Sequence, residues 1–290
     1  MTWQLIITLQ IIVSSLMAMF TRHITLSNRH VFIGVGVASY SAVALSGIIF
    51  SIISNNGFPT APSAIAWTYI FFEGLCIPAA WLIQYKLVSH LGAGNAVTIS
   101  TLNMLSAALL GVLFLNEAIS LSFVFGAMFI ITGTFITLRI RPDITHHNRP
   151  PFILMISLVI AGMILFAVGM YFEKTAINII GVWNYSAYGW GMQLIVIIIL
   201  FILFGRKELP HIKPKIIKNG LILGFMTSLA GGLYIYALSL GSLSHTIIAA
   251  SGKVAITVLL AAIFLKERNN ILLRATAFLL SVIGLSLVVY

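Results

Sequence analysis

Ten apolar runs, each about twenty residues long, follow one another along the chain with only short polar breaks between them. A run of this length spans the hydrocarbon core of a bilayer as a helix, and a backbone in hydrocarbon must satisfy its own hydrogen bonds. The runs are too long to be strands of a membrane barrel. The sequence therefore predicts an all-α integral membrane protein with ten transmembrane helices, at residues 3–20, 31–53, 63–83, 95–115, 120–138, 151–172, 179–204, 219–238, 245–265 and 271–289.

The composition agrees with a membrane protein. Of the 290 residues, 60% are hydrophobic and 8% are charged, whereas soluble domains carry about 25% charged residues. The first run has no basic segment before it and no small-residue cleavage site after it, so we expect a retained span rather than a cleaved signal peptide. The single cysteine, Cys76, excludes a disulfide framework within one chain.

The net charge of +10 predicts how the chain lies in the membrane. Basic residues of membrane proteins concentrate in cytoplasmic loops. Of the 16 Lys and Arg residues, 14 lie in or beside loops on one side, and the opposite loops contain only Lys174. We expect the basic loops to be cytoplasmic and both termini non-cytoplasmic, in a cell membrane, and we expect this charge to face lipid rather than nucleic acid. The 14 are Arg22, Arg29, Lys86, Arg139, Arg141, Arg149, Arg206, Lys207, Lys213, Lys215, Lys218, Lys266, Arg268 and Arg274.

The two halves of the chain, 1–143 and 144–290, look like repeats. The sequence Leu-Phe-Leu-Asn-Glu at 113–117 recurs as Ile-Phe-Leu-Lys-Glu at 263–267, an offset of 150. Each half holds five predicted helices, and because five is odd the second half must enter the membrane from the opposite side. The sequence therefore predicts two inverted five-helix repeats, an architecture in which secondary transporters expose a midplane site to each face in turn. Small residues spaced by seven follow both copies: Gly126 and Gly133, then Ala277 and Gly284.

Ten helices in two halves, with a Phe-Leu-x-Glu ending at the fourth and ninth, resemble the drug/metabolite transporter superfamily, in particular proteins with two EamA-type domains. In such domains the fourth helix ends in Leu-Gly-Glu and a helix containing Gly follows. Gly92-Ala-Gly-Asn-Ala96, Phe114-Leu-Asn-Glu117 and Gly126 fit this pattern, although Asn116 and Lys266 replace its Gly. Members of the superfamily usually have cytoplasmic termini, opposite to the charge count here. The resemblance implies transport of amino acids or related metabolites.

Two charged residues lie well inside the predicted spans, where a charge costs roughly 2.5 to 3.5 kcal/mol on insertion scales and marks a functional site by default. Lys253 lies in the ninth helix, and Asn103 lies 150 residues earlier, at the equivalent depth of the fourth. In nucleotide-sugar and phosphate-ester translocators of the superfamily, a lysine at a similar place binds the anionic substrate, so the resemblance implies this role for Lys253. The alternative is an ion pair with Glu73 or a bond to a helix carbonyl.

Glu73 lies midway along the third helix. It is a candidate to take up a proton that drives exchange, or to hold a substrate ammonium. The alternative is a protonated or lysine-paired carboxyl that only holds helices together.

The seventh helix opens with aromatic and amide side chains. Asn184 and Tyr188 lie one turn apart, and with Trp183 they predict a wall suited to a ring, a sugar or an organic cation. Trp183 equally fits the aromatic belt at a membrane interface. In the eighth helix Tyr234 is a candidate cavity residue. Small residues there predict close helix packing: Gly224, Ser228 and Gly232.

We therefore expect a secondary transporter of a small organic solute, with an amino acid or related metabolite as substrate. A sugar phosphate or nucleotide sugar is the alternative that Lys253 favours, and a non-transporting structural or regulatory membrane protein is the alternative from another class. The predicted substrate contacts are Lys253, Glu73, Asn103, Asn184, Tyr188, Tyr234 and Trp183.

Several further expectations concern partners and chemistry. The chain lacks Walker, hydrolase and zinc-protease signatures, so we expect no enzyme, no cofactor and no ATP-driven transport. His146 and His147 lack a spaced set of further ligands, so we expect no zinc site. Protons are a candidate coupling ion, and the expected state is a monomer or homodimer. Glu117 and Glu267 are expected to be solvated helix-end groups, with gate contacts as the alternative.

Overall fold

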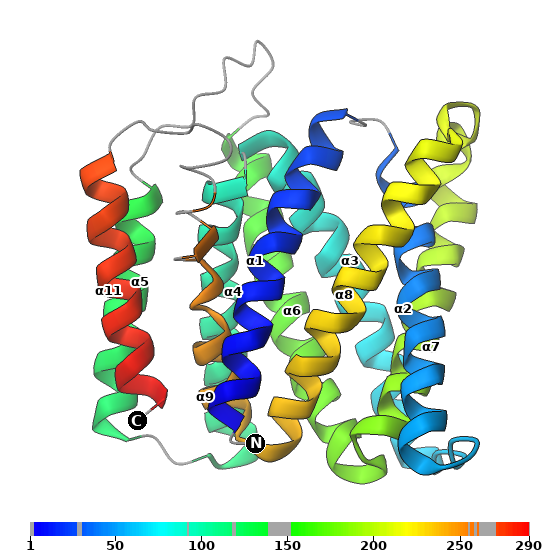
Figure 1. The fold of residues 1–290 in the computed structure, drawn as a ribbon, viewed down its shortest axis with the longest axis horizontal. Helices are drawn as coiled ribbons and strands as arrows, with labels where there is room; N and C mark the ends of the chain where they lie inside the picture. Colours follow the sequence, from blue (N-terminus) through cyan, green and yellow to red (C-terminus); the bar gives the residue numbers. More distant parts are fainter. Residues whose placement is uncertain are drawn as a thin grey trace.

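The structure is a computed structural model that describes residues 3–27, 31–91, 93–117, 120–138, 152–254, 256–257, 260 and 271–289. These residues contain ten α-helices (Figure 1), which confirms the prediction of an all-helical membrane protein. In the first half the helices are α1 (Trp3–Ser27), α2 (Phe32–Asn55), α3 (Ala64–Leu91), α4 (Ala93–Leu115) and α5 (Leu121–Leu138). In the second half they are α6 (Phe152–Ile180), α7 (Val182–Leu200), α8 (Pro214–Leu240), α9 (Leu243–Ala250) and α11 (Ile271–Val289).

The helices suit a bilayer on their outer faces. Among the described residues, 6 helical segments are long and apolar enough to cross a membrane: Trp3–Ile24, Phe32–Asn55, Ala64–Val88, Ile156–Ile180, Val182–His211 and Pro214–Leu240. Large apolar side chains such as Leu45, Ile164 and Phe225 remain exposed on these helices. In a membrane such side chains contact lipid tails, which are as apolar as they are.

The helices of the second half begin at a nearly constant distance after those of the first. α7, α8, α9 and α11 each start 150 residues after α2, α3, α4 and α5, and α6 starts 149 residues after α1. The same distance of 150 separates the two Phe-Leu-x-Glu sequences. Each helix of one half therefore has a counterpart in the other, and counterpart residues can be compared.

Packing follows the same correspondence. α2 packs on its counterpart α7, and α5 packs on α11; these pairs form the two opposite edges of the bundle in Figure 1. α3 packs on α6 as α8 packs on α1, and α3 packs on α7 as α8 packs on α2. Between the edges, α4 packs on α9.

The small residues predicted to support packing lie at these contacts. A Cβ on Gly284 of α11 would come within 2.6 Å of the carbonyl oxygen of Gly126 on α5. A Cβ on Gly224 of α8 would come within 2.2 Å of the carbonyl oxygen of Ser39 on α2. Only residues without a side chain allow the backbones to approach this closely.

Both ends of the chain lie at one end of the bundle, which we call the terminus end; the opposite end is the basic end (Figure 1). α1 finishes and α8 begins at the basic end. Most described cations lie in helix ends or connections there: Arg22, Lys86, Arg206, Lys207, Lys213, Lys215 and Lys218. Arg139, Arg141, His146, His147, Arg149 and Glu267 lie outside the described residues.

The sixth helix is longer than the sequence predicts. The prediction ends it at residue 172 and puts 173–178 in a loop, whereas α6 continues to Ile180. Lys174 is buried, and its Nζ donates to the carbonyl oxygens of Leu238 and Gly241 at the end of α8, at 2.6 and 2.8 Å. A charge that indicates a loop in the sequence is thus tied to a neighbouring helix in the structure.

A carboxylate holds the start of α9. Glu117, after α4, accepts hydrogen bonds from the amides of Leu243 and Ser244 and from the Ser244 hydroxyl at the start of α9. A carboxylate at a helix start satisfies amides that have no partner within the helix and complements the helix dipole. Glu117 is therefore not simply solvated, as the sequence suggested, but joins α4 to α9.

Candidate functional site

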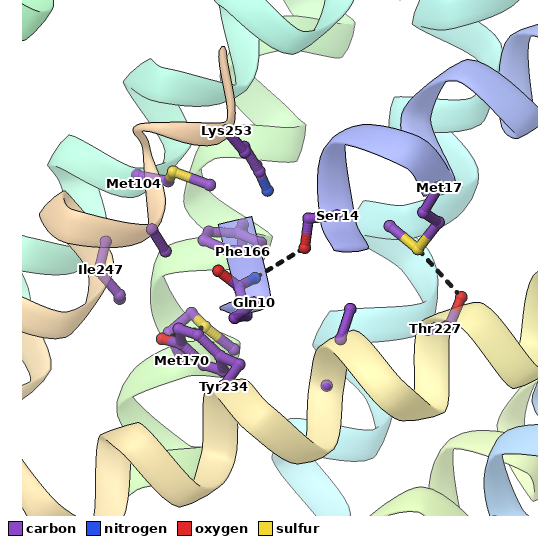
Figure 2. Close-up of a pocket in the computed structure, with 13 residues that line it drawn as sticks. Gln10, Ser14, Met17, Met104, Phe166, Met170, Thr227, Tyr234, Ile247 and Lys253 are labelled. Carbon is purple, nitrogen blue, oxygen red and sulfur yellow. Dashed lines mark hydrogen bonds between the residues drawn. The ribbon is translucent and has the colours of Figure 1, made fainter. Parts of the chain in front are cut away.

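Two adjoining cavities lie at the centre of the bundle, between α1, α3, α4, α6, α8 and α9. Their volumes are about 180 and about 260 Å³. The first is shown in Figure 2. The residues that line both are Ser14, Met17, Met104, Phe166 and Lys253.

The ninth helix is interrupted just before Lys253. The sequence predicts one continuous span over 245–265, but α9 ends at Ala250 and a turn follows at Ser251 and Gly252. The hydrogen bonds tighten there, since the Gly252 amide donates to the Ala249 carbonyl and that of Val254 to the Ser251 carbonyl. Inside a membrane such a break requires other partners for the backbone.

α1 supplies one of these partners. The hydroxyl of Ser15 is shared between two carbonyl oxygens, that of Ile11 in its own helix at 2.8 Å and that of Lys253 at 3.1 Å. The bond to Lys253 ties the interrupted segment to α1. The side chain of Lys253 points away from its own backbone into the space between Met104, Phe166 and Ser14 (Figure 2).

Among the residues that the structure describes, the ammonium of Lys253 is the only charged group that lines either cavity. Within the part of the chain that the structure describes, its Nζ has neither a hydrogen-bond partner nor an ion-pair partner. An unpaired ammonium in a low-dielectric site attracts an anion strongly.

Uncharged polar groups complete the lining. Gln10 Nε2 donates to Ser14 Oγ at 2.8 Å, and Thr227 Oγ1 donates to the sulfur of Met17 at 3.3 Å (Figure 2). Gln10 Oε1 and Asn103 Oδ1 are buried and have no partner among the described residues. These two amide oxygens can accept hydrogen bonds from a bound ligand.

The remaining wall is soft and apolar. Phe166, Met104 and Met170 face the first cavity from α4 and α6, and the Tyr234 hydroxyl lies 3.5 Å from the sulfur of Met170. Methionine side chains adapt to ligands of different shape. Trp81 and Tyr85 of α3 line the second cavity.

Three of the seven predicted site residues meet in this region. Lys253 lines both cavities, Asn103 lines the second and Tyr234 lines the first. Lys253 and Asn103 are counterparts under the 150-residue offset. The sequence did not indicate Gln10 and Thr227, because neither is charged and neither belongs to an aromatic cluster. The signal that points to them is an uncharged amide or hydroxyl in the middle of an apolar span.

The aromatic and amide residues of α7 lie elsewhere, at the terminus end. Asn184 bonds to the side chains of Asn55 and Thr60, and the Tyr188 hydroxyl donates to the Pro59 carbonyl oxygen at 3.1 Å. These contacts join α7 to the connection between α2 and α3. None of these residues lines either cavity.

Trp183 and Glu73 also lie apart from the cavities. The ring of Trp183 stacks on Tyr236, with centroids 5.6 Å apart. Glu73 is buried and accepts a hydrogen bond from Gln193 of α7. Glu73 and Lys253, which the sequence left as a possible ion pair, do not pair with each other in the described structure.

Comparisons with known proteins agree with this architecture. Residues 1–139 match the model of the EamA-like transporter family. A protein of Sinorhizobium sp described as an "Uncharacterized transporter in cobO 3'region" is 29% identical over 114 residues, which is 36% of this chain and 81% of that protein.

A solved structure described only as "Crystal structure of protein" has the same fold. It superposes with a TM-score of 0.76 and covers 98% of this chain and 95% of its own, at 14% identity. An identity this low shows the fold alone. The chain is a multi-pass membrane protein by its apolar helices, and its residues 1–139 are similar to the EamA-like transporter family.

Proposed function

We propose that the chain is a secondary transporter that carries a small organic solute by alternating access between two inverted five-helix repeats, residues 1–143 and 144–290. The spacing of helix starts supports the repeats. Because each repeat has five helices, the second crosses the membrane in the opposite sense to the first. A site between such repeats opens to each face in turn when one repeat rocks against the other.

Hydrogen bonds at the two ends of the α2–α7 pair support the inverted relation. At the terminus end, Asn184 at the start of α7 bonds to Asn55 and Thr60 at 2.9 and 3.1 Å. At the basic end, the amide of Gly34 at the start of α2 donates at 2.8 Å to Glu208, in the connection between α7 and α8. Gly34 and Asn184 are 150 residues apart. Each half therefore holds a connection of the other, at opposite ends of the bundle.

One observation carries the choice of solute: the Lys253 ammonium faces the cavities without a partner among the described residues. A carboxylate there would receive a charge-assisted hydrogen bond. The free amide oxygens of Gln10 and Asn103 would accept from an ammonium or hydroxyl of the same ligand. An amino acid or related metabolite carries both kinds of group.

A sugar phosphate or nucleotide sugar is the second candidate, because Lys253 would bind a phosphate equally well. The cavity volumes of about 180 and about 260 Å³ favour the smaller solute. Sites for drug-sized ligands measure roughly 300–1000 Å³. Because no carboxylate among the described residues lines the cavities, an organic cation is the least favoured of the solutes considered.

Of the predicted site residues, we assign solute contact to Lys253, Asn103 and Tyr234. Trp183, Asn184 and Tyr188 would instead hold the terminus end together. We further propose that the basic end faces the cytoplasm of a cell, that both termini are non-cytoplasmic, and that protons are the coupling ion, with Glu73 as a carrier.

The decisive experiment reconstitutes the purified protein in liposomes. Uptake is measured for a panel of labelled L-amino acids, sugar phosphates, nucleotide sugars and organic cations. We expect uptake of amino acids, and a weaker affinity for them in Lys253→Ala. Lys207→Ala is the matched control, because Lys207 is an exposed lysine far from the cavities.

Two outcomes would contradict the proposal. Wild-type affinity and rate in Lys253→Ala would remove this lysine from the site. An absence of binding and uptake for every solute in the panel would favour a structural or regulatory membrane protein.

A further inference from the structure

A second polar cluster is buried between α3, α6 and α7, outside both cavities. Glu73 of α3 is 0% exposed and Glu173 of α6 is 5% exposed. Tyr185 and Gln193 of α7 complete the cluster and are buried as well. The sequence placed Glu173 in a loop, so its proximity to Glu73 is visible only in the fold.

The two carboxyl groups belong to one site. Their sequence neighbours Phe72 and Phe172 stack with centroids 5.4 Å apart, which brings these positions of α3 and α6 to the same level. Each carboxyl lies within electrostatic range of the other, and the Tyr185 side chain lies near both.

The hydrogen bonding of this cluster is incomplete. Gln193 Nε2 donates to Glu73 Oε1. Among the described residues, Glu73 Oε2, Glu173 Oε2 and the Tyr185 hydroxyl are buried without a partner, and no Lys or Arg pairs with either carboxyl. The other titratable groups that face the carboxyls from neighbouring positions are uncharged Tyr and Cys side chains: Tyr40 of α2, Cys76 of α3 and Tyr234 of α8.

Two adjacent carboxyls in such a place cannot both be charged. Burial within a membrane protein removes the water that would stabilise each charge, and the two negative charges repel each other. A pair of this kind retains a shared proton, as in other buried carboxyl pairs. On these physical grounds a state with one proton shared by the pair is favoured over a state with two charges.

The corresponding contact between α8, α1 and α2 shows that the fold does not need polar side chains at this place. Under the offset between the halves, Glu73 corresponds to Leu223 and Tyr185 to Val35, while Glu173 corresponds to Ile24 at the α6–α1 distance of 149. These three counterparts lie together in one apolar core cluster: Leu223, Val35 and Ile24. The same helix junction is thus built twice, once from aliphatic side chains and once around two acids.

The acid cluster is mechanically linked to the cavities. Ile77, one turn after Glu73 on α3, lines the second cavity. Met170, one turn before Glu173 on α6, lines the first. Pro78 removes a backbone hydrogen bond from α3 at this level, which makes the helix easier to bend. A change in the charge of the cluster therefore acts on the two helices that border the solute.

We propose that Glu73 and Glu173 together form the proton-binding site that couples solute movement to the proton gradient, an inference that rests on the proposed transport function. A proton from one aqueous face binds a carboxylate oxygen of the pair and leaves to the other face after the halves have rocked. Gln193 donates a hydrogen bond to Glu73, and the Tyr185 hydroxyl, which has no partner among the described residues, is available to donate to the remaining carboxylate. Glu173 is as necessary as Glu73, because either carboxyl alone would lack the partner that keeps the proton exchangeable.

The first test detects the proton without any solute. Infrared spectra of the purified protein are recorded at neutral pH in water and in deuterium oxide, where a buried protonated carboxyl gives a deuterium-sensitive carbonyl band. We expect this band in the wild type, a shift or loss in Glu73→Gln and in Glu173→Gln, and no change in Glu208→Gln, whose carboxyl lies at the basic end. A wild type without the band, or a band unchanged in both variants, would overturn the proposal.

The second test separates coupling from solute binding. Proteoliposomes with an internal pH dye receive a mixture of the common L-amino acids, with and without an imposed pH gradient. We expect Glu173→Gln to lose gradient-driven accumulation while solute exchange in the absence of a gradient continues. Retention of wild-type accumulation in Glu173→Gln would overturn the coupling role.

A triple variant distinguishes a loss of coupling from a failure to fold. Glu73→Leu combined with Glu173→Ile and Tyr185→Val copies the counterpart junction, so the chain should fold and exchange solute but not couple it to protons. A triple variant that still accumulates solute against a pH gradient contradicts the proposal. Absence of all solute flux in the wild type would instead refute the transport function, and the infrared band would still decide whether the pair binds a proton.

Discussion

The two buried lysines, Lys174 and Lys253, should respond oppositely when each is replaced by methionine. Methionine keeps a long, flexible side chain and removes the charge, so the volume of each site changes little. Lys174 has two protein partners, the carbonyl oxygens of Leu238 and Gly241. Lys253 has none among the described residues.

The structure sets the size of each effect. A hydrogen bond from a charged donor contributes about 1.5–3 kcal/mol, and Lys174 makes two such bonds. Removal of the buried charge offsets part of this loss, so Lys174→Met should lower the free energy of unfolding by about 2–4 kcal/mol. For a chain of about this size the melting temperature should then fall by roughly 4–16 °C. Lys253→Met loses no partner and removes a buried charge, so its stability should be unchanged or higher.

Thermal unfolding in detergent, followed by tryptophan fluorescence and checked by size-exclusion chromatography, measures both variants beside the wild type. The matched control is Lys207→Met, an exposed lysine of the basic end. An equal loss of stability in Lys253→Met and Lys174→Met would refute the reasoning, because it would mean that Lys253 has a structural partner and that its ammonium is not free for a ligand.

Other contacts give smaller, separate predictions. Glu117→Ala should lower the melting temperature by several degrees, because the start of α9 loses three hydrogen bonds; the same detergent assay checks this, and an unchanged value contradicts the assigned role. Asn184→Ala loses exposed neutral hydrogen bonds and should cost about 1 kcal/mol or less. Gly224→Ala should abolish a monodisperse chromatographic peak, because its Cβ would come within 2.2 Å of the Ser39 carbonyl oxygen, whereas Gly191→Ala, with open space around the Cβ, should behave as wild type.

Much of the architecture follows from local sequence properties. The hydropathy of a run depends only on its own residues, so ten apolar runs predict helices whatever lies next to them in space. The offset of 150 residues between the two copies of one short motif also separates the starts of four helix pairs. Lys253 and Asn103 share a cavity for the same reason, since counterpart residues of two repeats lie at equivalent depth.

Helix boundaries were less predictable where charges are buried. Glu173 and Lys174 look like loop residues in sequence, yet α6 contains both, because Lys174 finds carbonyl partners on α8. The interruption after Ala250 has a comparable origin, since Ser15 of α1 helps to satisfy the backbone there.

The linear pattern is enough to predict a helical membrane protein with two similar halves and a lysine deep in the second one. Only the folded chain shows that Lys253 faces a cavity with no partner among the described residues, and that Glu73 lies near Glu173. It also shows that Asn184 and Tyr188 contact a connection and do not line a cavity. The physical reason is that the free energy of a buried charge depends on which groups distant helices bring within a few ångströms, and a linear pattern carries no such distances.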